Sequence, residues 1–308
     1  MKPRIIFGTV LSAAALLFLL IDLFNGRSLG IFCLVVLFAL GAQEELFRMA
    51  ESKGIRPRRD LGRFLAFALL FFWWGALRAR AAGAVQEISL PDGLPAVSVV
   101  SSEAPVALAA CLFLLLLSLL LREPGEEGII GAAFNALGLV YVAFLAGFVL
   151  EHRFFRAPLP AGGSGAPAVG AHAVILFLVV TKVADTAAYF VGKTVGRRRL
   201  APRLSPKKTC EGLAGALAGG GLAALLYVRL SPLGDHLGWL ATALFGILLG
   251  FVGQCGDLVE SYIKRSFGKK DSSALLPEFG GFLDLIDGVL LGAPFSFVYL
   301  SIAGLHPG

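Results

Sequence analysis

The stretch SYIKRSFGKKDSSALLPEFGGFLDLID, residues 261–287, carries four basic side chains, four acidic side chains and a Gly-Gly pair. Strongly apolar segments flank it at 237–256 and 289–305. Charge at this density beside a membrane costs free energy, so it usually marks a functional site. Lysine and arginine bind phosphate, and closely spaced aspartates hold divalent cations. The stretch therefore predicts a membrane protein with a site for phosphoryl or nucleotidyl transfer at the membrane surface.

The composition of the whole chain agrees with a membrane protein. Of its 308 residues, 57% are hydrophobic and only 16% are charged, and the mean hydropathy is +0.80. A soluble domain carries about 25% charged residues, so this chain has too little polar side-chain surface to face water on all sides. We expect an all-α, polytopic transmembrane protein. The net charge of +6 comes from lysines and arginines that lie mainly between the apolar segments, as in the loops of membrane proteins. This placement argues against nucleic acid as the partner.

About nine apolar segments approach the roughly 20 residues that a membrane-spanning helix needs. The first is too long for the apolar region of a signal peptide, and we interpret it as a retained helix. The second is expected to continue into the amphipathic sequence QEELFRMAESKG. The expected spans are residues 5–24, 29–42, 64–77, 105–121, 129–150, 172–191, 213–230, 237–256 and 289–305.

The positive charges test this count of spans. If the chain crosses the membrane nine times, nineteen lysines and arginines fall on the N-terminal side and six on the other. This asymmetry predicts a cytoplasmic N-terminus and cytoplasmic loops at 193–211 and 257–282. We divide the chain into N-terminal transmembrane helices, 1–150, and a C-terminal catalytic region, 172–308, joined by a linker rich in proline, glycine and alanine.

Two ionisable residues, Lys182 and Asp185, lie three apart inside an apolar helix and share one of its faces. Such residues within a membrane segment indicate function by default. The alternative is a structural ion pair that fixes the packing of helices.

The loop at 192–212, GKTVGRRRLAPRLSPKKTCEG, is strongly basic. The triplet Gly192-Lys193-Thr194 does not complete a P-loop, because Ala187 stands where the first glycine would be. The hydroxyl of Ser205 with the ammonium groups of Lys207 and Lys208 can bind phosphate oxygens. The alternative is a positive-inside loop that contacts anionic lipid.

A third constellation approaches the loop at 257–282 from the eighth span. Asp257, Glu260, Ser261 and Lys264 have helical spacing. If the span continues as a helix into the cytoplasm, Asp257, either Glu260 or Ser261, and Lys264 share a face. The pair Gly280-Gly281 permits positive φ and close approach of the backbone to a ligand.

Asp284 and Asp287 lie three apart at the start of the last span. On a helix they point the same way and can share a metal ion with Asp257. A Mg²⁺ site needs few protein ligands, because substrate phosphates and water supply the others.

These motifs together resemble the phosphatidate cytidylyltransferase, or CDP-diacylglycerol synthase, family. Its signature reads approximately S-x-x-K-R-x4-K-D-x5-P-G-H-G-G-x-x-D-R-x-D. Upstream, GDLVES at 256–261, DTAAYFVGK at 185–193 and SPKKTCEG at 205–212 match further family segments, so the similarity covers about residues 180–290. The signature residues in register are Ser261, Lys264, Arg265, Lys270, Asp271, Pro277, Gly280, Gly281, Asp284 and Asp287.

The resemblance implies transfer of the cytidylyl group of CTP to phosphatidic acid, with Mg²⁺ as cofactor, at the cytoplasmic face of the inner membrane. It implies metal ligands at Asp257, Asp284 and Asp287, which with Lys264 and Asp271 form the catalytic set. The residues implied to bind substrate are Asp185, Ser205, Lys207, Lys208, Ser261, Arg265, Lys270, Gly280 and Gly281.

The chain departs from the signature at two places: Glu278-Phe279 replaces the Gly-His pair, and Leu285 replaces the arginine between the last two aspartates. We hypothesise that Phe279 and Leu285 pack against each other. Two alternatives stay open: an enzyme acting with CTP on another lipid phosphate, and a catalytically degenerate paralogue that only binds lipid. The oligomeric state also stays open, with a homodimer among the alternatives.

Overall fold

The computed structural model describes residues 22, 28–82, 103–121, 125–156, 169–269, 272 and 281–307. Eight of its helical segments are long and apolar enough to cross a membrane. This confirms the prediction of an all-α, polytopic membrane protein. The first expected span, 5–24, lies outside the described residues except for Asp22, and the eight others each correspond to one helical segment.

The N-terminal half contributes four of these segments. The expected extension of 29–42 into the amphipathic sequence is confirmed, because the helix there is continuous as far as Glu51. The fourth segment contains a stretch of π-helix, η2. The helices of the N-terminal half are α2 (Leu29–Glu51), α3 (Arg59–Ala81) and α4 (Glu103–Leu117), which continues as the 3-10 turn η1 (Ser118–Leu121). The fourth segment consists of α5 (Glu126–Leu137), η2 (Gly138–Phe144) and α6 (Leu145–Arg153) in succession.

The C-terminal half contributes the other four segments and two small sheets. Strand β1 (Phe155–Arg156) pairs antiparallel with β4 (His306–Pro307), and β2 (Arg199–Ala201) pairs antiparallel with β3 (Ser205–Thr209). The helices are α7 (Val169–Thr194), α8 (Cys210–Arg229), η3 (Pro232–Asp235), α9 (Trp239–Ser266) and α10 (Phe282–Ile302).

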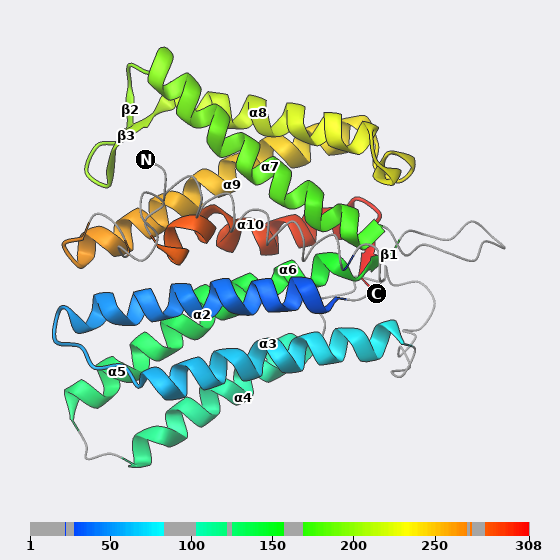
Figure 1. The fold of residues 1–308 in the computed structure, drawn as a ribbon. Coiled ribbons are helices and arrows are strands. Elements are labelled where there is room, and N and C mark those ends of the chain that lie inside the picture. The colour runs from blue at the N-terminus through cyan, green and yellow to red at the C-terminus, as the bar shows by residue number, and fades with distance from the viewer. Residues whose placement is uncertain are drawn as a thin grey trace, which may run out of the picture.

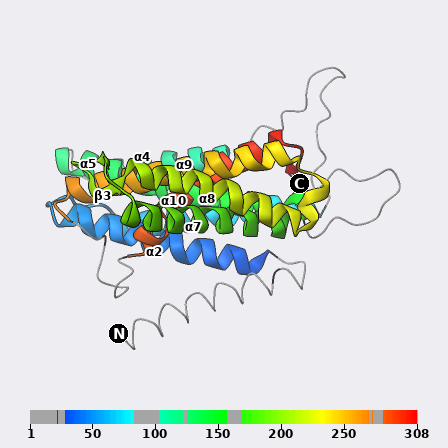
Figure 2. The same ribbon diagram turned by 90° about the horizontal axis from the view of Figure 1, so that it is seen from above.

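The long helices lie side by side, and α10 joins the two halves of the bundle (Figure 1). It packs against α9 on one side and against α6 and α2 on the other. Seen from above, α7 and α8 cover α10 (Figure 2). One core cluster includes Leu46 of α2, Phe177 of α7 and Leu290 of α10, so the halves share a continuous interior.

Glycines allow the helices of the C-terminal half to touch closely. A Cβ atom on Gly246 of α9 would lie 2.2 Å from the carbonyl oxygen of Gly220 in α8. A Cβ atom on Gly256 would lie 2.5 Å from the carbonyl oxygen of Asp287 in α10. Only glycine fits at such contacts, and the second brings Asp257 and Asp287 into the same region.

Two basic segments of the chain lie at the same end of the helix bundle. In Figure 1, α2, α7 and α9 end at the same end of the bundle where α3, α8 and α10 begin, together with the β2–β3 hairpin. Strands β1 and β4 lie at the opposite end. The basic segments at 48–59 and 193–208 therefore share one end, as alternating spans require.

Candidate active site at the hairpin end of the bundle

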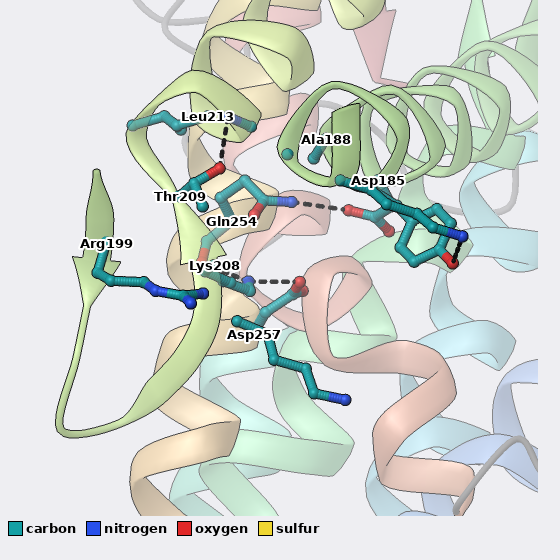
Figure 3. A pocket seen from close by; sticks show the side chains of 13 residues that line it. Asp185, Ala188, Arg199, Lys208, Thr209, Leu213, Gln254 and Asp257 are labelled. Atoms are coloured by element: carbon teal, nitrogen blue, oxygen red, sulfur yellow. Dashed lines mark hydrogen bonds and ion pairs between the residues drawn. The ribbon is translucent and has the colours of Figure 1, made fainter. Parts of the chain in front are cut away.

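A pocket of about 430 Å³ opens between α7, the β2–β3 hairpin, α8 and α9. Its wall is mixed in charge, with cations from α7 and the hairpin and carboxylates from α7 and α9 (Figure 3). The lining residues are Asp185, Ala188, Tyr189, Gly192, Lys193, Arg199, Lys207, Lys208, Thr209, Gly212, Leu213, Gln254 and Asp257.

The hairpin is fixed on the first turn of α8. The side chain of Thr209 caps α8 by accepting a hydrogen bond from the Gly212 N–H at 3.0 Å. The carboxylate of Glu211 accepts hydrogen bonds from the backbone N–H groups of Arg197 and Arg198. These local contacts hold the basic strand in place without using its lysines, which remain available to the pocket.

Lys208 reaches from the hairpin to α9. Its Nζ lies 2.6 Å from Oδ2 of Asp257 and 3.5 Å from the carbonyl oxygen of Gln254 (Figure 3). Lys207, its neighbour on β3, is exposed and lines the same pocket. The pocket can therefore bind phosphate oxygens from one wall while the other wall remains acidic.

The two ionisable residues in the membrane segment of α7 have different hydrogen-bond partners. Asp185 accepts a hydrogen bond from Nε2 of Gln254 at 3.2 Å and faces the pocket. Lys182 donates to the backbone carbonyl of Leu285 in α10 at 2.9 Å. Lys182 thus ties α7 to α10 next to the final two aspartates.

Asp257 lies close to the start of α10. Its Oδ1 is buried and has no hydrogen-bond partner among the described residues, and it would lie 3.3 Å from a Cβ atom on Gly288. Asp287 is within electrostatic range of Asp257, Glu260 and Lys182. An unpartnered carboxylate oxygen beside further carboxylates suits a cation, because carboxylate oxygens are hard ligands that can only accept hydrogen bonds.

Asp284 belongs to a separate cluster. Lys264 of α9 bridges Asp284 and Glu260, with its Nζ 2.6 Å from the glutamate. Oδ2 of Asp284 accepts hydrogen bonds from the Gly281 N–H at 2.7 Å and from the Ser272 hydroxyl at 2.6 Å. Within the described ranges, no three His, Cys, Asp or Glu side chains form a group that could hold a metal ion by themselves.

The structure brings many of the predicted site residues together. Asp185, Lys207, Lys208 and Asp257 line the pocket, and Asp287 adjoins it. Four members of the signature, Lys270, Asp271, Pro277 and Gly280, lie outside the described residues, as does Phe279.

Other predicted residues support the backbone or lie nearby. Arg265 binds the carbonyl oxygens of Leu204 and Lys269, tying α9 to the hairpin. Ser205 begins β3, and Ser261 is half-buried on α9.

Gly281 does not use the positive φ that a glycine permits, because its φ is −122°. The reason for a glycine there is space, since a Cβ atom would lie 2.1 Å from Oε2 of Glu45.

Sequence reasoning missed several residues at this end. Tyr189, Lys193, Arg199 and Gln254 line the pocket but were not assigned a role. The first two lie inside the matched segment 185–193, which was the available signal. Glu45 was also missed, because Glu44 and Arg48 lie beside it in the amphipathic sequence QEELFRMAESKG and nothing there singles it out.

The chain is similar to known proteins along nearly its whole length. Residues 2–303 match the profile described as the cytidylyltransferase family. The chain is 30% identical over 304 residues to a phosphatidate cytidylyltransferase of Bacillus subtilis, covering 98% of both chains. It is 36% identical over 185 residues to a phosphatidate cytidylyltransferase of Thermotoga maritima, covering 59% of this chain and 63% of the relative.

A third relative has no assigned activity in its name. It is the uncharacterized protein YnbB of Escherichia coli, 40% identical over 153 residues. The match covers 50% of this chain and about half, 49%, of that relative.

Proposed function

This chain belongs to the cytidylyltransferase family, and we propose that it transfers the cytidylyl group of CTP to phosphatidic acid, giving CDP-diacylglycerol and pyrophosphate. The observation that carries the proposal is the pocket in which Lys208 meets Asp257. It combines cations for the phosphates of a nucleotide with carboxylates for a metal ion. The match of 98% of the chain to a phosphatidate cytidylyltransferase of Bacillus subtilis supports phosphatidic acid as the lipid substrate.

Catalysis of this reaction requires mainly that the two substrates are positioned and that the negative charge on the phosphates is stabilised. An oxygen of the lipid phosphate attacks the α-phosphorus of CTP, the new O–P bond forms, and the bond to the β-phosphate breaks to release pyrophosphate. The attacking phosphate is anionic near neutral pH, so little proton abstraction is needed. Lys207, Lys208 and Arg199 would bind and orient the phosphates.

We infer that Mg²⁺ is the metal cofactor, held by Asp257 and Asp287. The unpartnered Oδ1 of Asp257 and the nearby carboxylate of Asp287 support this choice. When bound, the ion neutralises charge that develops on the phosphates. Asp284 would join the ligands only by exchanging its contact with Lys264, so its role as a ligand stays a prediction.

The proposed lipid substrate can approach from the bilayer. Tyr189 lines the pocket, and the neighbouring side chains of Phe190 and Val195 are exposed. Apolar side chains at this rim suit acyl chains, while the cationic wall suits the phosphate headgroup. We propose the cytoplasmic membrane as the location, with the hairpin end facing the cytoplasm, where CTP is found.

The experiment is an assay of the purified full chain with CTP, phosphatidic acid and Mg²⁺, with detection of CDP-diacylglycerol by mass spectrometry. Lysophosphatidic acid and a polyprenyl phosphate serve as alternative acceptors. Product from phosphatidic acid alone supports the proposal. Product only from another acceptor reassigns the lipid, and CTP binding without any product indicates a degenerate paralogue.

A further inference from the structure

The start of α10 is capped by a residue from the other half of the chain. Glu45 of α2 accepts a hydrogen bond from the Phe282 N–H at 2.9 Å through Oε1. It accepts another from the Leu283 N–H at 3.0 Å through Oε2. Both carboxylate oxygens therefore bind the first turn of α10 across a separation of more than 230 residues in sequence.

Glu45 is fully buried, with an exposure of 0%. A buried carboxylate is costly unless donors compensate for the lost water. Here the donors include two backbone N–H groups at a helix N-terminus, where the helix dipole also favours negative charge. The contact is therefore specific to a carboxylate in this position.

A second set of contacts links Glu45 to the acidic cluster. The Ser272 hydroxyl lies 2.8 Å from Oε2 of Glu45 and 2.6 Å from Oδ2 of Asp284. It carries one proton, so it can donate to only one of them at a time. The Gly281 N–H completes the cap by donating to Asp284.

The capped turn leads directly into the candidate active site. Asp287 follows Leu283 by about one helical turn, and its backbone carbonyl oxygen is the atom that a Cβ on Gly256 of α9 would meet first. A small shift in the start of α10 would therefore move Asp287 relative to Asp257.

We propose that Glu45 is a positioning residue, which holds the first turn of α10 so that Asp287 and Asp257 stay together. The proposal rests on the proposed function for its catalytic consequence. It assigns a part of the active site to the N-terminal half of the chain, which otherwise supplies membrane helices.

The test compares Glu45→Gln, Glu45→Asp and a matched control, Glu44→Gln, in the full chain. Glu44 is the adjacent carboxylate on the same helix, but it pairs with Arg48 and Arg59 instead. Hydrogen–deuterium exchange of a peptide spanning 281–290 reports the cap independently of activity. Steady-state kinetics at varied Mg²⁺ concentrations report its effect on the proposed site.

We expect faster exchange at 281–290 in Glu45→Gln, a kcat at least about tenfold lower, and a higher Mg²⁺ concentration for half-maximal activity. A tenfold change corresponds to about 1.4 kcal/mol, near the lower end of what one hydrogen bond to a charged group contributes. Glu45→Asp, which keeps the charge but is shorter by one methylene, should fall between wild type and Glu45→Gln. Glu44→Gln should match wild type.

Three results would overturn the proposal. The first is unchanged exchange in both Glu45 variants. The second is faster exchange with wild-type kcat and Mg²⁺ dependence, which would make the cap purely structural. The third is an equal effect in Glu44→Gln. Wild-type protein that forms no CDP-diacylglycerol would instead refute the proposed function, and the exchange data would still decide whether Glu45 holds α10.

Discussion

Lys208 Nζ and Asp257 Oδ2 lie 2.6 Å apart, joining the β2–β3 hairpin to α9 across the pocket. Both side chains are about one-fifth exposed, so a ligand can reach them. An incoming phosphate would compete with Asp257 for Lys208, and Asp257 would then be free to bind a cation. The ion pair thus keeps the Lys208 ammonium and the Asp257 carboxylate side by side in the absence of substrate.

The first prediction concerns Lys208. In Lys208→Gln, kcat/KM for CTP should fall about a hundredfold, because one phosphate contact is lost and Asp257 loses its cationic partner. Arg229→Gln, at the other end of α8, is the control for a general loss of positive charge. Equal kinetics in the two variants would exclude Lys208 from the site.

The second prediction concerns the metal. Asp→Asn substitutions at Asp257, Asp284 and Asp287 keep the shape of the side chain but remove its charge. Turnover should fall at least about a hundredfold in each, if each carboxylate supplies a few kcal/mol of transition-state stabilisation. Chelation of Mg²⁺ should abolish turnover in wild type, and added Mg²⁺ should restore it. Near-normal activity in all three folded variants would refute the metal site.

The third prediction compares two glycines of α9. Gly246→Ala places a methyl group against the backbone of Gly220, and such overpacking costs about 1–3 kcal/mol. A Cβ atom on Gly253 meets nothing within 4 Å, so Gly253→Ala should be neutral or slightly stabilising. Thermal unfolding in detergent measures both variants. A lower Tm for Gly253→Ala than for Gly246→Ala would contradict the packing of α8 on α9.

The fourth prediction concerns the bridge made by Lys264. Lys264→Met leaves the buried carboxylate of Glu260 and its neighbour Asp284 without their shared cation, and breaking such a pair costs about 3–5 kcal/mol. The Tm should therefore fall clearly, and adding Glu260→Gln should recover part of the loss. Lys53→Met, at an exposed lysine, serves as the control. A double variant less stable than Lys264→Met would argue against the bridge.

The fifth prediction concerns membrane topology. In a variant without native cysteines, single cysteines at Lys53 and Arg203 should react with a reagent confined to the cytoplasmic side, because both lie at the hairpin end. A cysteine at Leu230, at the far end of α8, should react only from the outside. Labelling of positions 203 and 230 from one side would refute the orientation.

The sequence by itself determined the class of fold and predicted which charged residues form the site. Apolar runs of sufficient length must form helices in lipid, since the backbone has no other way to satisfy its hydrogen bonds. Charges concentrated between such runs predicted a site, with Lys208, Asp257 and Asp287 among its residues. The structure places Lys208 and Asp257 in one pocket and Asp287 beside it. The extension of α2 into the amphipathic sequence QEELFRMAESKG was also predicted from the sequence, and the helix is continuous as far as Glu51.

Only the tertiary structure decided how these residues are grouped. Asp284 and Asp287 share a helix and point similarly along it. One nevertheless pairs with Lys264 and the other lies beside Asp257, because α9 offers these two partners about two turns apart. Lys182 and Asp185 likewise separate, toward Leu285 and Gln254. Periodicity gives the face of a helix, but it cannot give the neighbour that the face meets.

Glu45 shows this limit most clearly. Nothing in its local sequence distinguishes it from Glu44, since both occupy a helix that leaves the membrane. The packing of α2 against α10 buries one of them at a helix N-terminus and leaves the other to pair with Arg48 and Arg59. The packing of the whole bundle determines a contact between residues that are so far apart in the chain. The local sequence around either residue does not predict it.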